Sequence, residues 1–244
     1  MKRWALISGL RGDLELYEQI QVELKHQREI ESLFVLGDLI GPNRSCDDLL
    51  KRLREPKRTD IKPNCVYGWW EEQLLAERGY RGDRKADALR QSHGEKAVSQ
   101  LKEAVDSSHL PWLASLQFGF IELDCALIHA SSADVGDKLT ADTSPLILLD
   151  RLTRLDVNRL FTAHGGQQFR VKLTGGAIQS EVKDHAGVHQ GDQAVPKRSV
   201  IGIGQQASYT LYDPATDLVE FMQAGRSSAT TKPQGKGFGQ EANK

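Results

Sequence analysis

The feature that most constrains the fold is a short apolar segment, residues 33–36, that ends directly at Gly37 and Asp38. An apolar run of this length, bounded by polar residues, is typical of a buried β-strand. Residues 4–8, 65–67, 126–129 and 159–163 repeat the pattern. Helix-like segments lie between several of them, the first at residues 14–24 with Asp13 as its expected N-cap. The first two thirds of the chain therefore alternate between strands and helices.

The last third predicts strands alone. Residues 169–173 and 177–182 flank a Thr-Gly-Gly turn, which predicts a β-hairpin, and further strands are expected at residues 200–203, 208–212 and 218–221. Alternating elements followed by antiparallel strands are typical of two packed sheets with helices on their outer faces. We therefore expect an α/β (α+β) protein with mixed sheets.

Five short segments follow one another in an order that is informative about the family: ISGLRG at 7–12, LGD at 36–38, YGWWE at 67–71, LIH at 127–129 and FTAHGG at 161–166. Together they resemble the calcineurin-like metallophosphoesterase superfamily. In that family the segments read D-x-H-G, G-D, G-N-H-D/E, a strand ending in His, and G-H-x-H. The resemblance covers roughly residues 4–222 and implies a four-layer α-β-β-α sandwich with metal ions at the carboxyl ends of its strands.

The resemblance also implies that this chain is a degenerate member with most metal ligands replaced. In the family two cations share the Asp of the G-D segment, which is Asp38 here. One cation would need ligands at Gly9, Arg11 and Gly166; the glycines carry no ligand group and arginine stays protonated. The family's general acid would stand at Trp70, whose indole cannot protonate a leaving alkoxide. We therefore assign no catalytic residue.

The second cation site would draw on Asp38, His129 and His164, with Trp69 in the position of a fourth ligand. A carboxylate and two imidazoles suit a single divalent ion, Zn or Mn. The alternative is that no metal binds and that both histidines are hydrogen-bonded core residues.

Arg11, Trp69 and Trp70 are expected to line the former metal pocket. Arg11 either neutralises Asp38, within roughly 4 Å of it, or offers a cation to a phosphate ligand. Trp69 and Trp70 either fill the vacated pocket or form an interface, since Trp is enriched in binding hot spots. On an extended loop neighbouring side chains diverge, which predicts one indole directed inward and one outward.

Composition limits the remaining possibilities. The formal net charge of −1 over 244 residues provides no field for nucleic acid or anionic membranes, so neither is an expected partner. No apolar run reaches the roughly 20 residues of a membrane span. Three scattered cysteines, Cys46, Cys65 and Cys125, fit a reducing cytoplasm. We expect residues 1–223 to form the phosphoesterase-like domain and the polar residues 224–244 to form a disordered tail.

These observations favour a catalytically impaired protein that uses the phosphoesterase fold as an interaction or regulatory module with a protein partner. Two alternatives stay open. One is a residual phosphoesterase with a single metal ion at Asp38, His129 and His164. The other is a sensor that binds a phosphate-bearing small molecule near Arg11 without hydrolysing it.

Overall fold

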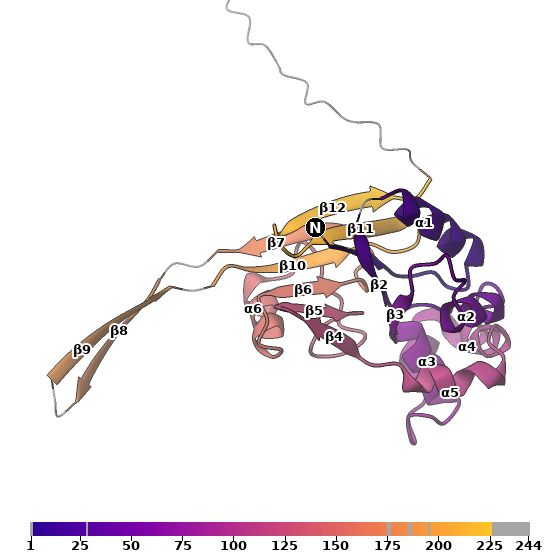
Figure 1. The fold of residues 1–244 in the computed structure, drawn as a ribbon. Helices are drawn as coiled ribbons and strands as arrows, with labels where there is room; N and C mark the ends of the chain where they lie inside the picture. The colour runs from indigo at the N-terminus through magenta and orange to yellow at the C-terminus, as the bar shows by residue number, and fades with distance from the viewer. Residues whose placement is uncertain (1, 28, 175–176, 185–186, 195, 226–244) are drawn as a thin grey trace, which may run out of the picture.

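The computed structural model describes residues 2–27, 29–174, 177–184, 187–194 and 196–225. Two five-stranded mixed sheets pack face to face with helices on their outer sides (Figure 1), which confirms the predicted four-layer sandwich. No helix in the described ranges is long and apolar enough to cross a bilayer. Most of the predicted tail, residues 226–244, lies outside the described residues.

The first sheet has the strand order β12-β11-β1-β2-β3. Strand β1 is parallel to β2 and antiparallel to β11, so the beginning of the chain is paired with its last third. The bounds are β1 (Arg3–Ile7), β2 (Ile30–Leu36), β3 (Pro63–Val66), β11 (Ser208–Asp213) and β12 (Leu218–Gln223).

The second sheet has the order β4-β5-β6-β10-β7, with parallel pairs β5–β6 and β6–β10 at its centre. Its strands are β4 (Gly119–Glu122), β5 (Cys125–Ile128), β6 (Arg159–Thr162), β7 (Gln168–Leu173) and β10 (Arg198–Ile203). A separate antiparallel pair, β8 (Ala177–Asp184) and β9 (Gly187–Ala194), extends away from the sandwich (Figure 1).

Helices cover both sheets. The first sheet packs on α1 (Leu14–His26), α2 (Asp47–Arg54), α3 (Trp69–Glu77), α4 (Asp87–Glu103) and α5 (Leu110–Ser115), the last preceded by a short 3-10 turn, Ser107–His109. Helix α6 (Pro145–Thr153) packs on the second sheet. The side-chain oxygen of Asp13 accepts from the Leu16 amide at 3.0 Å, which confirms it as the α1 N-cap.

The alternation of side chains along each strand separates three buried layers. On β1, Trp4 and Leu6 face the second sheet, whereas Ala5 and Ile7 face the helices. This period-2 pattern is what a strand buried on both faces requires.

Two local predictions were wrong. The predicted hairpin of residues 169–173 and 177–182 does not form, because β7 pairs with β10 and β8 pairs with β9. Phe169 of β7 packs against Gly202 of β10, where a Cβ would lie 2.3 Å from the ring, so this long-range pairing buries an aromatic side chain. Trp69 and Trp70 are also not on an extended loop, since they form the first turn of α3.

Candidate functional site

The carboxyl ends of β1, β2, β5, β6 and β10 meet at one edge of the sandwich. Loops after these strands carry Arg11, Asp38, His129, His164 and Gln205 respectively. Backbone hydrogen bonds join the first two loops, from the Arg11 amide to the Asp38 carbonyl at 3.0 Å and from the Gly12 amide to the Leu39 carbonyl at 2.8 Å. Arg11 and Asp38 both adopt left-handed backbone conformations, with φ of 46° and 54°. Backbone strain from left-handed conformations is often found at functional sites, where loops position side chains.

Position 37 requires glycine because Gly68 and His129 lie too close to it for a larger residue. It has φ of 71°, and a Cβ there would lie 2.5 Å from the Cα of Gly68 and 2.9 Å from Nδ1 of His129. The G-D segment therefore brings the β2 loop against both the start of α3 and the β5 histidine.

Glu71 holds the same loops together from inside. Its buried carboxylate accepts hydrogen bonds from the backbone amides of Gly68 at 2.6 Å, Asp38 at 2.9 Å and Ile40 at 2.9 Å. The bond to Gly68 caps α3, which explains why the helix begins at Trp69. Burial, together with the charge of Asp38, raises the pKa of Glu71 to about 7, although the amide donors oppose this shift.

Asp38, His129 and His164 lie together, as the resemblance implied, with one ligand atom of each within 4.8 Å of the others. Nε2 of His129 is 3.3 Å from Oδ1 of Asp38 and 3.1 Å from Nδ1 of His164. Asp38 and His129 are each only 1% exposed. Burial lowers the pKa of His129, and burial with the neighbouring His129 lowers that of His164 to about 4, so both rings are neutral near pH 7.

The tautomer of His129 is fixed by the backbone. Its Nδ1 lies 2.7 Å from the carbonyl oxygen of Leu36, which can only accept, so Nδ1 carries the proton. Nε2 therefore directs a lone pair at Oδ1 of Asp38, which already accepts from the Trp70 amide at 3.3 Å. Two acceptors facing each other in a buried site favour a cation or a proton between them.

The other side of Asp38 is occupied by Arg11 and Gln205. A guanidinium nitrogen of Arg11 lies 3.8 Å from Oδ2 of Asp38, which confirms the predicted ion pair. Gln205 bridges the two: its Nε2 donates to Oδ2 of Asp38 at 3.3 Å, and its Oε1 accepts from Arg11 at 3.1 Å. A Cβ added at Gly9 would lie 2.8 Å from Cβ of Gln205, so Gln205 uses space that the small residue leaves free.

Gln205 was not predicted, because it lies 167 residues from Asp38 in the sequence. The available signal was the Gly202 and Gly204 pair at the end of β10, because Gly204 has φ of 83° and turns the chain back toward the site. Glu71 was also missed, although it occupies the acidic position of the family segment G-N-H-D/E.

The two tryptophans differ in environment. Trp70 is 5% exposed and belongs to the core beneath the first sheet. Trp69 is half-buried and lies between two imidazoles. The centroid of its ring is 6.2 Å from that of His164 and 5.8 Å from that of the exposed His93. The indoles contact each other edge to face at 4.9 Å. Trp69 thus forms part of the wall beside the candidate ligands, whereas Trp70 fills the interior.

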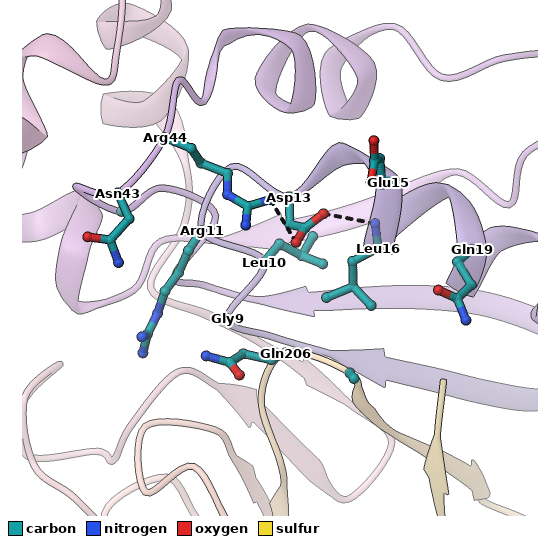
Figure 2. Close-up of a pocket in the computed structure, with 12 residues that line it drawn as sticks. Gly9, Leu10, Arg11, Asp13, Glu15, Leu16, Gln19, Asn43, Arg44 and Gln206 are labelled. Atoms are coloured by element: carbon teal, nitrogen blue, oxygen red, sulfur yellow. Dashed lines mark hydrogen bonds and ion pairs between the residues drawn. The ribbon is translucent and has the colours of Figure 1, made fainter. Parts of the chain in front are cut away.

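A cavity of about 480 Å³ opens on the α1 side of Arg11. In Figure 2 Arg11 extends along it toward Gln206, away from the ion pair of Arg44 with Asp13, which measures 2.8 Å. Nε of Arg11 is buried and has no hydrogen-bond partner in the part of the chain that the structure describes. Arg11 therefore stands between Asp38 and an open, polar cavity.

A solved structure with a similar fold is a metallophosphoesterase from Sphaerobacter thermophilus, with a TM-score of 0.60, 17% sequence identity, and coverage of 91% of this chain and 88% of that one. The chain has the metallophosphoesterase fold. Weaker similarity extends to a putative diadenosine tetraphosphatase (TM-score 0.49, 10% identity, 93% and 95% coverage) and a cold-active protein-tyrosine phosphatase of a psychrophilic Shewanella species (0.47, 11%, 91% and 81%). No family model and no curated protein matches the sequence.

Within this fold one group of described side chains, Asp38, His129 and His164, could hold a metal ion. Ligands at about 2.0 Å from a tetrahedral ion stand roughly 3.3 Å apart. The 3.1 Å and 3.3 Å separations around His129 match that spacing. Asp38, His129 and His164 would hold such an ion, which would polarise a bound phosphoryl oxygen. Where the resemblance implies a second ion, Arg11 presents a guanidinium, which cannot act as a ligand, and Oε1 of Gln205 accepts a hydrogen bond from it at 3.1 Å.

Proposed function

We propose that this protein is a catalytically impaired metallophosphoesterase-fold module that binds a phosphate-bearing ligand and acts through that binding. The observation that carries the proposal is the Arg11–Gln205 unit on one side of Asp38. It supplies a fixed positive charge with planar N–H donors where the family has an exchangeable metal ion, and guanidinium is well suited to phosphate oxygens.

Partial exposure of Arg11 supports ligand binding over a purely structural role. Its side chain is 34% exposed and lines the cavity shown in Figure 2, whereas Asp38 beneath it is inaccessible. A phosphate placed against the outer edge of the guanidinium would extend its organic group into this cavity. Position 70, where the resemblance implies the general acid, holds a buried indole, which cannot protonate a leaving oxygen.

Titration of the protein with inorganic phosphate, combined with a turnover assay on p-nitrophenyl phosphate in millimolar Mn, tests the proposal. We expect phosphate binding that is weakened at least tenfold by Arg11→Gln, and turnover no higher than a single-metal background. The matched control is Arg58→Gln, at an exposed arginine that makes no ion pair among the described residues. Turnover that disappears in Asp38→Ala would contradict the loss of catalysis.

A residual phosphoesterase with one metal ion is the second candidate. The one-ion spacing of Asp38, His129 and His164 favours it. In that case the turnover would require Mn or Zn, and His164→Ala would remove it while leaving phosphate binding at Arg11 largely intact.

A protein partner at Trp69 is a further part of the proposal. The half-buried indole and the exposed imidazole of His93 lie side by side near the mouth of the site. An aromatic surface of this kind suits an interface, and a docked protein there would cover the candidate ligands.

A further inference from the structure

The amino ends of β6 and β10 form a second site at the opposite edge of the sandwich, roughly 15 Å of strand away from His164 and Gln205. Here the turn between β11 and β12 reaches across from the first sheet. Asp217 in that turn pairs with Arg159 at 2.7 Å and with Arg170, so one carboxylate connects two arginines of the second sheet. A cavity of about 230 Å³ lies beside this cluster.

The strand register sets cations side by side in this cavity. Ser199 of β10 is paired with Lys172 of β7 on one side and with Arg159 of β6 on the other. Paired residues share a face of the sheet, so the three side chains form one row. Arg170 lies two residues before Lys172 on the same face. Lys197 and Arg198 line the cavity together with these side chains.

Among the residues whose side chains are described here, 2–27, 29–174 and 196–225, the positive charges of the lining outnumber their partners. Within that part of the chain Asp217 is the one carboxylate of the lining, and Asp124 pairs with Arg159 at 3.2 Å. Arg198 bonds there to neutral groups, Asn158 at 3.3 Å and Thr153 at 3.0 Å. Within the same residues the side chains of Lys172 and Lys197 have no ion pair or hydrogen bond, and Nε of Arg170 is buried without a partner. Like charges gathered in a partly enclosed space repel unless an anion joins them.

We propose that this cavity binds a compact polyvalent oxyanion, of the chemical class of inorganic phosphate or diphosphate. The cavity is small and its cations come from neighbouring strands of one sheet, which suits a small anion better than a nucleic acid. Lys172 and Lys197 supply exposed ammonium groups, while Asp217 holds Arg159 and Arg170 in place.

Calorimetric titration with diphosphate at low salt tests this site. Because the proposed function places a second phosphate site at Arg11, the titrations use full-length protein carrying Arg11→Gln. We expect one equivalent to bind, and Lys172→Ala with Lys197→Ala to weaken binding at least tenfold. The matched control is Lys85→Ala with Lys96→Ala, which removes the same charge from two exposed lysines near or on α4 and should change affinity less than twofold.

Three results would overturn the inference. They are no binding in the Arg11→Gln protein, unchanged binding in the Lys172/Lys197 variant, and equal weakening in the control, which would indicate general electrostatics. The first result would leave the proposed function standing if diphosphate still binds the protein that retains Arg11. Thermal midpoints of all variants establish that each one is folded.

Discussion

At the scale of single residues, the pair Arg11 and Asp38 controls the candidate site. Asp38 is a buried carboxylate, and burial raises its pKa while Arg11 opposes that rise. An ionised carboxylate that loses its only neighbouring arginine must be neutralised by a proton or by a metal ion. Arg11 therefore links the stability of the protein to the phosphate binding that we propose.

Replacement of Arg11 should cost more stability than replacement of an ordinary surface arginine. In the presence of a chelator we expect Arg11→Ala to lower the free energy of unfolding by about 2 kcal/mol, because a buried acceptor loses its charged partner. Arg58→Ala is the control and should stay within about 0.5 kcal/mol of the parent protein. Urea denaturation measures both, and equal effects would show that Arg11 does not stabilise Asp38.

Substitution of the two adjacent tryptophans should lower the free energy of unfolding by different amounts. Trp70→Ala removes a buried indole and should cost about 3–5 kcal/mol. Trp69→Ala removes a half-buried one and should cost only roughly 1–2 kcal/mol. If Trp69 forms an interface, its substitution should also weaken association with a partner captured from the native cell. Equal losses of stability would instead assign both rings to pocket filling alone.

At the scale of elements, single side chains connect segments that lie far apart in the sequence. Glu71 connects the start of α3 to the loop after β2, and Asp217 connects the two sheets at the opposite edge. Each satisfies several donors at once. Removal of either side chain should therefore affect more than one element.

Glu71 allows a graded test. Glu71→Ala leaves three buried amides without an acceptor and should cost on the order of 3 kcal/mol or more, at roughly 1 kcal/mol or more for each. Glu71→Gln keeps one acceptor oxygen and should fall between the alanine variant and the parent. The midpoint of urea denaturation orders the three proteins, and an alanine variant as stable as the parent would show that water replaces the carboxylate.

Asp217 gives a prediction for pH. Burial opposes ionisation, but hydrogen bonds and charges from Arg159 and Arg170 outweigh it and hold the pKa of Asp217 below its usual value. A carboxyl with a lowered pKa contributes stability above its unfolded pKa of about 4 and loses it as the pH falls through the folded value. Asp217→Asn should therefore melt a few degrees lower at pH 7, and the difference from the parent should shrink below pH 4. A constant difference would contradict the ionic origin.

The elements differ in how far the sequence predicted them. The strands of β1 and β2 and the N-cap at Asp13 followed from local apolar runs and capping chemistry. The predicted hairpin after Leu173 was wrong because local turn signals do not report the burial of Phe169 against Gly202. Gly202 lies on β10, which begins 29 residues after Phe169. The Arg11–Asp38 pair was predicted through the family resemblance. Gln205 was not, because only the tertiary structure brings it to Asp38.

At the scale of the whole molecule, the fold is that of a solved metallophosphoesterase, and the candidate site lies around Asp38, where the carboxyl ends of strands from both sheets meet. Under the proposed function, the chemistry offered at this edge differs from that of the family. The protein should therefore keep the shape of a phosphate-binding site with at most one metal ion.

Metal stoichiometry tests this expectation. After incubation with excess Zn and exhaustive dialysis, elemental analysis should find no more than one ion per chain, and Asp38→Ala should remove it. His93→Ala is the control, since this exposed imidazole is not among the grouped ligands. Two ions per chain, both lost in Asp38→Ala, would show that the second ion finds ligands other than Arg11 and Gln205.

The position of β1 has a consequence for biosynthesis. The strand lies between β2 and β11, so one of its edges stays open until residues 208–213 have left the ribosome. Gln205 reaches Asp38 at the same stage, because it immediately precedes that strand. A nascent chain that stalls earlier exposes an unpaired apolar edge and is prone to aggregate. The candidate site can therefore assemble only when nearly the whole described chain has been translated.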